Sequence, residues 1–591
     1  MNSSQQYLSF YMPFMPDFRS MHLYPASLKV VGGKRWGYIN SLGKIILPFQ
    51  YEDAFDFQEN GLAIVGKNEL FGVIDQTGKY VVKPKYETIN QFSEGRAVVV
   101  DKEGFKVINE RGRLITDKAY QFIGTFEDDR ALFANSDSKG NYLYGFLNRN
   151  GQEVIPNKYQ SATDFNVGKA VVKVKEGQFA LIDREGTVLH TYNYAYVGSY
   201  GDGLLVFQQS LNDKQGYMNE AGEVVIPAQF VTALSFQNGR AVVNISETYE
   251  NKYGLIDKQG NFVIKPDYND VNLLGEGRIA VGVANDSERP YIGSKYAIAD
   301  FDGNLLTMFV YMDVSNYNNG FASANNNQNT FFIDRAGKVA ENLPIVSGSG
   351  ILSFDEELVK ANVDYRLFYY NRAGGLVWAQ NTIIPLNGQY RVFEQRYKPN
   401  KDYLVYYPQV KGMTDATTQQ RVNKRLRELS VLKEVNPDVQ LDYSYLGDFS
   451  VPFFKNVLLQ LELNGYEYYF GAAHGMPTKD YVHVNLENGN FYELKDLFKP
   501  DSNYVKILSE LVGKQIKNDE EYFYIFPDSY KGITANQSFY VTEDALYLYF
   551  SPYEIAPYAA SFPTFKIPFA EIMPIINVEG EFWQAFHEEE R

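Results

Sequence analysis

A short motif recurs ten times in the first two thirds of the chain, and it constrains the fold more than any other feature. Its core is an aromatic residue, a glycine, two apolar residues, Asn or Asp, two variable residues and a closing glycine, as in Trp36-Gly37-Tyr38-Ile39-Asn40 before Gly43. Repetition at a fixed period is typical of stacked or radial repeat architectures. The closing glycines recur every 34 to 43 residues, at Gly43, Gly78, Gly112, Gly151, Gly186, Gly222, Gly260, Gly303, Gly337 and Gly374.

An Asn or Asp precedes each closing glycine by three residues. An Asx side chain can accept a hydrogen bond from a backbone N–H two residues on, and glycine supplies the positive φ of a tight turn. The motif therefore predicts a β-hairpin turn in each copy rather than a calcium site. The ten residues are Asn40, Asp75, Asn109, Asn148, Asp183, Asn219, Asp257, Asp300, Asp334 and Asn371.

The flanking residues predict three, or at most four, short strands per copy. One strand precedes the turn and one follows it. The second strand often reaches a proline, which cannot donate to a strand ladder, so this strand ends there or lies at an edge of the sheet. A motif glycine marks a place where backbones pack closely. It is present as Gly37, Gly72, Gly145, Gly216 and Gly254, and is replaced by Lys106, Ala180, Ala297, Phe331 and Phe368 in the other copies.

The recurring aromatic residues are most consistent with a stacked core; the alternative is an exposed ladder for sugars or peptides.

These patterns predict a mainly β fold with a β-hairpin repeat array, open superhelical or propeller-like, of about ten units. Propellers typically have four to eight blades, so a single closed ring of ten is not favoured. We expect an N-terminal extension at 1–29, the array at 30–380, a linker at 381–400 and an α+β domain at 401–591. The linker is expected to separate two independently folding pieces.

The repeats resemble the WG-repeat proteins of bacteria, with a complete signature in the first copy and degenerate third, fifth and eighth to tenth copies. The resemblance covers about residues 34 to 380. It implies a β-rich interaction scaffold and no established activity.

The last third alternates strands with two helices, which predicts the α+β domain. Asp415 or Thr414 is expected to begin a helix that runs to about Val435, and Asp501 or Ser502 the second. Residues 400 to 575 resemble a C-terminal domain of lysozyme-sensing anti-sigma factors and peptidoglycan-deacetylase-associated proteins. The resemblance is carried by Tyr407-Pro408-Gln409, Gly471 to Gly475, Glu493 to Phe498 and Phe550 to Ala559. It implies a location at the cell envelope or exterior, although no signal peptide is visible.

Composition excludes several classes of function. A net charge of −16 disfavours nucleic acid as a partner and favours a basic one. The absence of cysteine excludes disulfides and cysteine chemistry. No apolar run is long enough for a membrane helix.

The sequence contains no recognisable catalytic or ligand-binding motif, and we predict no catalytic, cofactor or metal site. The candidate binding loop comprises His474, Gly475, Asp480 and His483. A metal site could use His474, Asp480 and His483, but a turn histidine and an unrelated strand histidine explain the same residues. His474 as a catalytic base lacks an identifiable nucleophile.

The favoured function is therefore a non-enzymatic binding or scaffold protein. Its repeat surface would recognise a protein, possibly a basic one, or a component of the cell envelope. The alternative is a cell-wall-acting enzyme, or its accessory subunit, with chemistry near His474.

Overall fold

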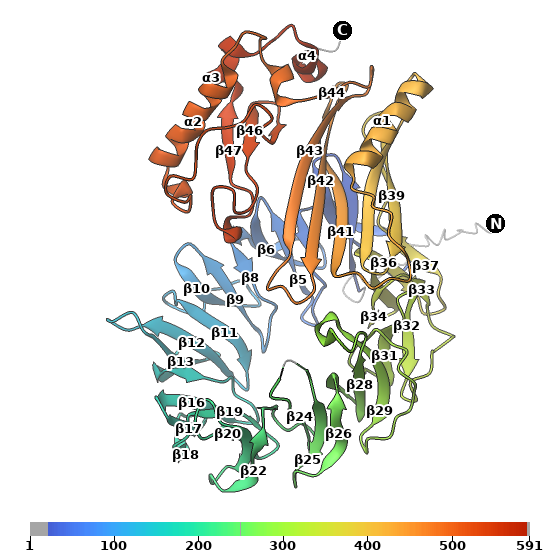
Figure 1. Ribbon diagram of the computed structural model, residues 1–591. Helices are drawn as coiled ribbons and strands as arrows, with labels where there is room; N and C mark the ends of the chain where they lie inside the picture. The colour runs from blue at the N-terminus through green and yellow to red at the C-terminus, as the bar shows by residue number, and fades with distance from the viewer. Residues whose placement is uncertain (1–21, 249, 588–591) are drawn as a thin grey trace, which may run out of the picture.

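The computed structural model describes residues 22–248 and 250–587 (Figure 1). Ten small antiparallel sheets of three or four strands follow one another along residues 24–379, and a larger mixed sheet begins directly after them. This confirms the mainly β repeat fold with a C-terminal α+β domain. Each of the ten sheets contains one copy of the motif, so one repeat corresponds to one blade.

The first five blades contain β1 to β18. Their strands are β1 (Tyr24–Val30), β2 (Gly33–Ile39) and β3 (Ile45–Tyr51); β4 (Asp53–Ala54), β5 (Leu62–Lys67), β6 (Leu70–Asp75) and β7 (Tyr80–Tyr86); β8 (Thr88–Ile89), β9 (Arg96–Asp101) and β10 (Gly104–Asn109); β11 (Phe122–Glu127), β12 (Arg130–Ser136), β13 (Tyr142–Asn148) and β14 (Glu153–Tyr159); β15 (Ser161–Ala162), β16 (Lys169–Lys175), β17 (Gln178–Asp183) and β18 (Val188–Tyr192).

The other five blades contain β19 to β37. Their strands are β19 (Tyr196–Gly201), β20 (Leu204–Gln208), β21 (Gln215–Asn219) and β22 (Val224–Phe230); β23 (Thr232–Ala233), β24 (Arg240–Asn244), β25 (Tyr253–Asp257) and β26 (Phe262–Tyr268); β27 (Asp270–Gly275), β28 (Arg278–Ala284) and β29 (Ser294–Asp300); β30 (Asp313–Val314), β31 (Phe321–Asn325), β32 (Asn329–Asp334) and β33 (Val346–Ser347); β34 (Gly350–Asp355), β35 (Leu358–Val363), β36 (Arg366–Asn371) and β37 (Leu376–Ala379).

The predicted turn chemistry is present in all ten blades. The Asn40 Oδ1 atom accepts hydrogen bonds from the Leu42 and Lys44 N–H groups at 3.1 and 2.9 Å, and Gly43 has a φ of 75°. At least the second of these bonds recurs in each of the other nine copies. The side chains of these Asn and Asp residues therefore stabilise the turn.

The motif glycines are required by close backbone contact. A Cβ atom on Gly37 or Gly72 would lie 2.5 Å from the carbonyl oxygen of Leu47 or Val82 on the next strand. At this point the next strand bulges out of register. A side chain could not occupy this position unless the bulged strand moved away.

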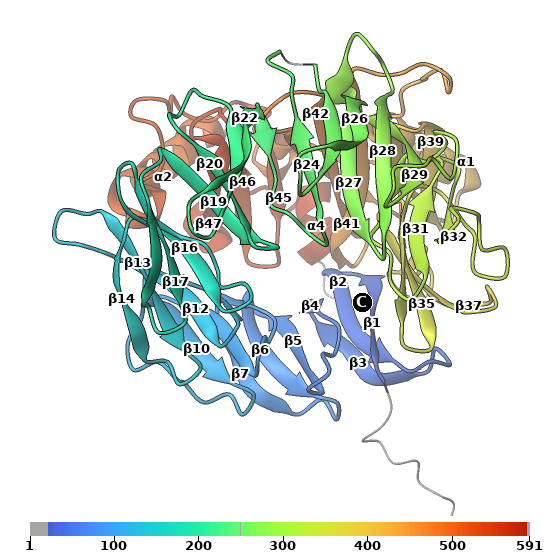
Figure 2. The same ribbon diagram turned by 90° about the horizontal axis from the view of Figure 1, so that it is seen from below.

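The ten blades close into a ring. The array is therefore propeller-like rather than open, and the prediction against a single closed ring of ten blades was wrong. The described residues form ten apolar clusters between neighbouring blades, including one between the first and last. An open row of ten blades would have only nine such interfaces. Figure 2 shows β1–β3 beside β35 and β37, where the ring closes.

Among the described residues, side-chain contacts close the ring, and the first and last blades share no strand. The Tyr24 and Tyr369 rings lie 5.4 Å apart, and the buried Tyr369 hydroxyl donates to the Pro25 carbonyl at 3.0 Å. Residues 22–29, which were predicted to be part of an N-terminal extension, thus belong to the first blade. Residues 1–21 of that extension lie outside the described residues.

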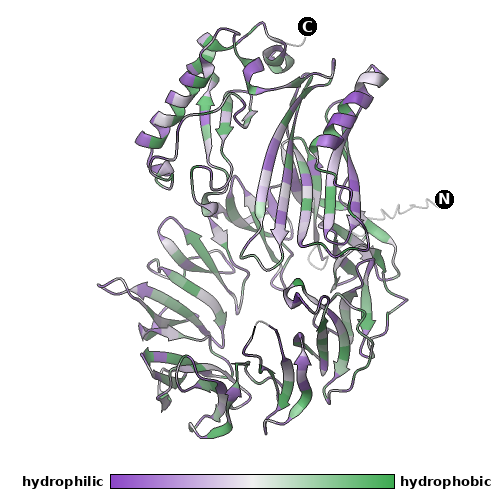
Figure 3. Cartoon of the chain, viewed as in Figure 1, coloured by the Kyte–Doolittle hydropathy of each residue, from purple (hydrophilic) through white to green (hydrophobic). Residues whose placement is uncertain are grey.

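The C-terminal domain is built on a seven-stranded sheet, β38 to β44. Apolar residues of α1 cover one face of this sheet, and a three-stranded sheet with α2 and α4 packs on the other (Figure 1). The exposed side of α1 is hydrophilic (Figure 3). The strands are β38 (Ile383–Pro385), β39 (Arg391–Asn400), β40 (Tyr403–Lys411), β41 (Tyr443–Lys455), β42 (Leu458–Tyr469), β43 (Met476–Asn485), β44 (Phe491–Tyr492), β45 (Phe539–Val541), β46 (Ala545–Tyr549) and β47 (Thr564–Pro568); the helices are α1 (Ala416–Leu429), α2 (Tyr504–Asn518), α3 (Phe569–Ile572) and α4 (Glu581–His587).

Two predicted boundaries differ from the structure. The expected linker at 381–400 forms β38 and β39, because Asn387-Gly388 lies in a hairpin turn and Pro385 lies on an edge strand that tolerates it. Helix α1 begins after Asp415 as predicted but ends at Leu429, before Val431 with its φ of 54°.

Candidate binding cleft between the ring and the C-terminal domain

The predicted loop residue His474 lies between β42 and β43 and is exposed. Its ring stacks on Tyr558 with centroids 4.0 Å apart, and its Nε2 atom lies 3.2 Å from the Tyr553 hydroxyl. Gly475 is buried, and its N–H donates to the Tyr466 hydroxyl at 3.0 Å. The contacts of His474 are those of a turn residue packed among tyrosines.

The other two predicted residues point away from His474. The side chain of His483 is 1% exposed, stacks on Phe539 and lies 3.0 Å from Gln460 Oε1. Burial lowers the pKa of His483 to about 3, so this histidine is neutral. Asp480 lies three residues earlier on the same strand and therefore on the opposite face of the sheet.

The structure does not bring His474, Asp480 and His483 together into a metal site. Within residues 22–248 and 250–587, no group of three or more His, Asp or Glu side chains is placed to hold a metal ion.

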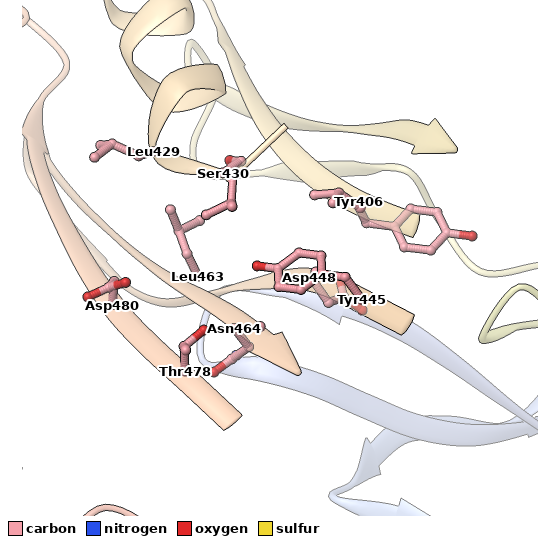
Figure 4. Close-up of a pocket in the computed structure, with 13 residues that line it drawn as sticks. Tyr406, Leu429, Ser430, Tyr445, Asp448, Leu463, Asn464, Thr478 and Asp480 are labelled. Atoms are coloured by element: carbon pink, nitrogen blue, oxygen red, sulfur yellow. The ribbon is translucent and has the colours of Figure 1, made fainter. Parts of the chain in front are cut away.

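A pocket on the α1 face of the large sheet contains Asp480, but it is too small for a ligand. Figure 4 shows Asp480 and Thr478 on one side of this pocket and Tyr445 on the other. Its volume of about 20 Å³ is close to that needed by one water molecule.

A much larger cleft lies between the last two blades and the opposite face of the large sheet. Its volume is about 850 Å³, which is within the range of small-molecule sites. The ring contributes residues from β30, β31, β34 and β35, and the domain contributes residues from β39 to β42. The lining comprises Asp313, Asn325, Ser349, Gly350, Ile351, Asn362, Asp364, Tyr365, Lys398, Lys401, Asp402, Leu404, Ser444, Tyr445, Leu446, Tyr466 and Tyr468.

Tyr365 is the most unusual residue of this cleft. It occupies the two-residue turn between β35 and β36 with a φ of 59°, after Asp364 with a φ of 48°, and it is 73% exposed. A bulky residue in the left-handed region is an outlier that surrounding contacts must hold in place. The corresponding two-residue turns of the second and fifth blades are Asn68-Glu69 and Glu176-Gly177, without an aromatic residue.

Asp364 holds this turn against the C-terminal domain. Its carboxylate pairs with Lys398 at 2.8 Å and with Arg396, and its carbonyl oxygen accepts a hydrogen bond from Tyr406. Burial by itself would raise the pKa of Asp364, but hydrogen bonds from Lys398 and the Ser349 N–H outweigh it and lower the pKa. The carboxylate therefore stays ionised.

Next to this turn, a buried ion network joins the ring to the domain. Arg366 on β36 pairs with both Glu394 and Asp448 at 2.9 Å and lies over the Tyr406 ring. Lys29 on β1 contacts the same two carboxylates. The side chains of Arg366 and Glu394 are 9% and 6% exposed. Because unpaired buried charges are costly, the network favours one fixed arrangement of the ring and the domain.

The His474 loop borders the cleft through one residue. Tyr466, which lines the cleft, accepts the hydrogen bond from Gly475. The sequence indicated this loop but missed the wall on the ring. The available signal was Asp364-Tyr365, where an aromatic residue stands at a position that elsewhere in the array favours a turn former.

Comparisons with known families agree with both halves of this structure. Residues 36–70, 71–104, 144–177, 216–249 and 253–285 match the WG containing repeat, and residues 495–570 match the family described as "Protein of unknown function (DUF3298)". The chain carries WG repeats followed by a DUF3298-like domain. The five matched repeats are those that keep the motif glycine.

Individual relatives are distant. The chain is 26% identical over 165 residues to the peptidoglycan-N-acetylmuramic acid deacetylase PdaC of Bacillus subtilis, which is 26% of this chain and 34% of that protein. The chain thus spans about a third of the length of this curated relative.

Two solved DUF3298 proteins are also similar. One from Bacteroides fragilis has 18% identity and a TM-score of 0.25, over 32% of this chain and 93% of its own. One from Pseudomonas aeruginosa has 18% identity and a TM-score of 0.26, over 35% and 98%.

Proposed function

We propose that this chain is a non-enzymatic binding protein whose ligand occupies the cleft between the ring and the C-terminal domain. The observation that carries the proposal is an exposed tyrosine, Tyr365, held in a left-handed turn at the edge of this cleft. Backbone strain of this kind persists where surrounding contacts support it, and it clusters at ligand sites.

The buried ion network supports the same proposal. A cleft with walls from two domains binds tightly only if those walls are already in place, because ordering them on binding would cost affinity. Arg366 and Lys29 on the ring side share the carboxylates of Glu394 and Asp448 on the domain side. The two walls are thereby pre-organised.

The contacts of His474 favour binding over catalysis. A general base needs a nucleophile or a polarised water within reach and usually a group that orients the ring. The described partners of His474 are the Gly475 carbonyl, the Tyr553 hydroxyl and the Tyr558 ring. Nothing in this set is an activated nucleophile.

We further propose that the ligand is a component of the cell envelope. PdaC, which is named for its action on peptidoglycan, is similar to part of this chain. No helix in the described residues is long and apolar enough to span a membrane.

The test is co-sedimentation of the full chain with purified peptidoglycan sacculi. Ile351 is 46% exposed and lines the cleft, so Ile351→Lys should place a charged side chain in the site and abolish sedimentation. Ile345 is 51% exposed and is not part of the lining, so Ile345→Lys is the matched control and should sediment like the wild type. A wild-type chain that stays in the supernatant, or an Ile351→Lys chain that sediments fully, would contradict the proposal.

A basic protein is the other candidate partner, because the net charge is −16. Association driven by opposite charges weakens steeply as salt screens them. Binding of lysozyme, a basic protein, that disappears between about 0.05 and 0.5 M salt and is unaffected by Ile351→Lys would favour this partner.

A further inference from the structure

We propose that the cleft binds an uncharged oligosaccharide, with the Tyr365 ring as a stacking surface for a sugar face. The inference rests on the proposed function, because it assumes that the cleft is the binding site. It adds the chemical class of the ligand and the residue that recognises it.

The charges of the lining are the first argument, because they largely neutralise one another. Lys398 pairs with Asp364 at 2.8 Å, and Lys401 pairs with Asp402 at 2.9 Å. Asp313 is the charged lining residue without an ion pair in the part of the chain that the structure describes. A lining of this kind lacks the clustered like charges that bind anionic or cationic ligands.

The neutral polar groups of the lining are the second argument. The side chains of Asn362 on the ring wall and Ser444 on the domain wall make no hydrogen bond to any described residue. An amide and a hydroxyl both donate and accept. Together with the second carboxylate oxygen of Asp313, whose Oδ1 atom accepts a hydrogen bond from the Val314 N–H at 2.9 Å, they suit a ligand rich in hydroxyl groups, each of which also donates and accepts.

The aromatic rings are the third argument. Tyr365 is 73% exposed and Tyr466 is 41% exposed, and they come from opposite walls of the cleft. The Tyr365 ring has no aromatic or cationic partner among the described residues. Tyrosine combines a large apolar face with a polar tip, which matches a sugar ring with C–H groups on its face and hydroxyls at its edge.

The fixed position of Tyr365 is the fourth argument. The turn residue Asp364 is anchored by Lys398, Arg396 and the Ser349 N–H, so the backbone that presents Tyr365 is rigid. A stacking residue on a rigid turn loses little entropy when it binds. The strain at Tyr365 is therefore consistent with a recognition role.

The test is calorimetric titration of the full chain with two neutral probes, tetra-N-acetylchitotetraose and cellotetraose. Binding of the first alone identifies a glycan that carries acetamido groups, and equal binding of both identifies recognition of the sugar faces and hydroxyls. Either result supports the inference. The affinity should change less than about threefold between 0.05 and 0.5 M salt, because no net charge is recognised.

The variants isolate the stacking residue. Tyr365→Asn removes the ring and keeps a residue that tolerates a positive φ, so it should fold and bind about tenfold more weakly. Glu69→Asn alters the corresponding turn of the second blade, where φ is 62°, and should bind like the wild type. Unchanged binding by Tyr365→Asn would overturn the assigned role of this residue.

Failure of the inference can be told apart from failure of the proposed function. If the wild-type chain sediments with sacculi and Ile351→Lys does not, the cleft is the site. The inference is wrong if neither oligosaccharide binds to that same preparation at about 1 mM. The binding free energy would then be weaker than roughly −4 kcal/mol, and the ligand would not be a neutral glycan.

Discussion

The ring and the C-terminal domain bury their apolar residues in different ways. The ring has ten small clusters, each shared by two neighbouring blades, whereas the domain has two larger clusters on the two faces of one sheet. A blade therefore packs mainly against its two neighbours, as in other repeat proteins, and the first and last blades also contact the domain. The domain depends on contacts distant in sequence, such as those between Gln460 and Val541. The ring is modular and the domain is not, and the cleft lies where the two meet.

Disrupting the ion network between the ring and the domain should have the largest effect on the free energy of unfolding. Arg366→Ala leaves Glu394 and Asp448 with Lys29 alone and removes the contact with Tyr406, so the free energy of unfolding should fall by about 3–5 kcal/mol. Urea denaturation measures this loss. Lys214→Ala removes an exposed ion pair with Glu247, which solvent screens, and should change stability far less. Equal effects of the two variants would mean that the ring and the domain are not coupled through this network.

Acid should destabilise the domain through His483 while the ring is spared. The pKa of this histidine is about 3 in the folded chain, below its unfolded value near 6.5, so its contribution is present above pH 6.5 and is lost as the pH falls towards 3. Between pH 6.5 and 4.5 the loss is about 2 kcal/mol.

The control for this titration is the exposed His474. Stability against urea should depend less on pH in His483→Phe than in the wild type, whereas His474→Gln should follow the wild type. A wild-type pH profile in His483→Phe would show that His483 takes up a proton without cost in the folded state.

A single methyl group should destabilise one blade and its neighbours and leave the domain intact. In Gly72→Ala the new Cβ atom would lie 2.5 Å from the Val82 carbonyl oxygen, which should cost about 1–3 kcal/mol. Hydrogen exchange should rise in β5 to β7 and in the neighbouring blades. Gly388→Ala adds the same methyl group to a domain turn with nothing within 4 Å and should change little. Uniform loss of protection over the whole chain would contradict the modular description of the ring.

The smallest effect is expected at the ring closure. Tyr369→Phe removes the hydrogen bond to the Pro25 carbonyl and should cost about 1 kcal/mol. Tyr217→Phe removes an equivalent bond to Leu234 in an internal blade. If closure is the weakest interface, a protease should release N-terminal fragments faster from Tyr369→Phe than from Tyr217→Phe. The same cleavage pattern in both variants would make all interfaces of the ring equivalent.

The sequence predicts the ring far better than the cleft. Asn40 to Gly43 specifies its turn from local chemistry, and ten copies make the repeat unmistakable. Closure could not be predicted, because it depends on how a small rotation between blades adds up over ten repeats. The prediction of a linker was wrong because Asn387-Gly388 is compatible with a hairpin turn as well as with a boundary between domains. The cleft escaped prediction because Asn362 and Ser444 are far apart in the chain and neither belongs to a motif.

The closure of the ring without a shared strand also bears on how such a protein can change over generations. Each blade is encoded by one uninterrupted stretch of sequence, from the first blade to the last. Duplication or deletion of one stretch would add or remove a complete blade and leave every other sheet whole. A ring joined by strand exchange would instead have to preserve both of its ends together. Blade number can therefore change by whole repeats, provided that the rotation between neighbouring blades adjusts so that the first and last blades still meet at the domain that completes the cleft.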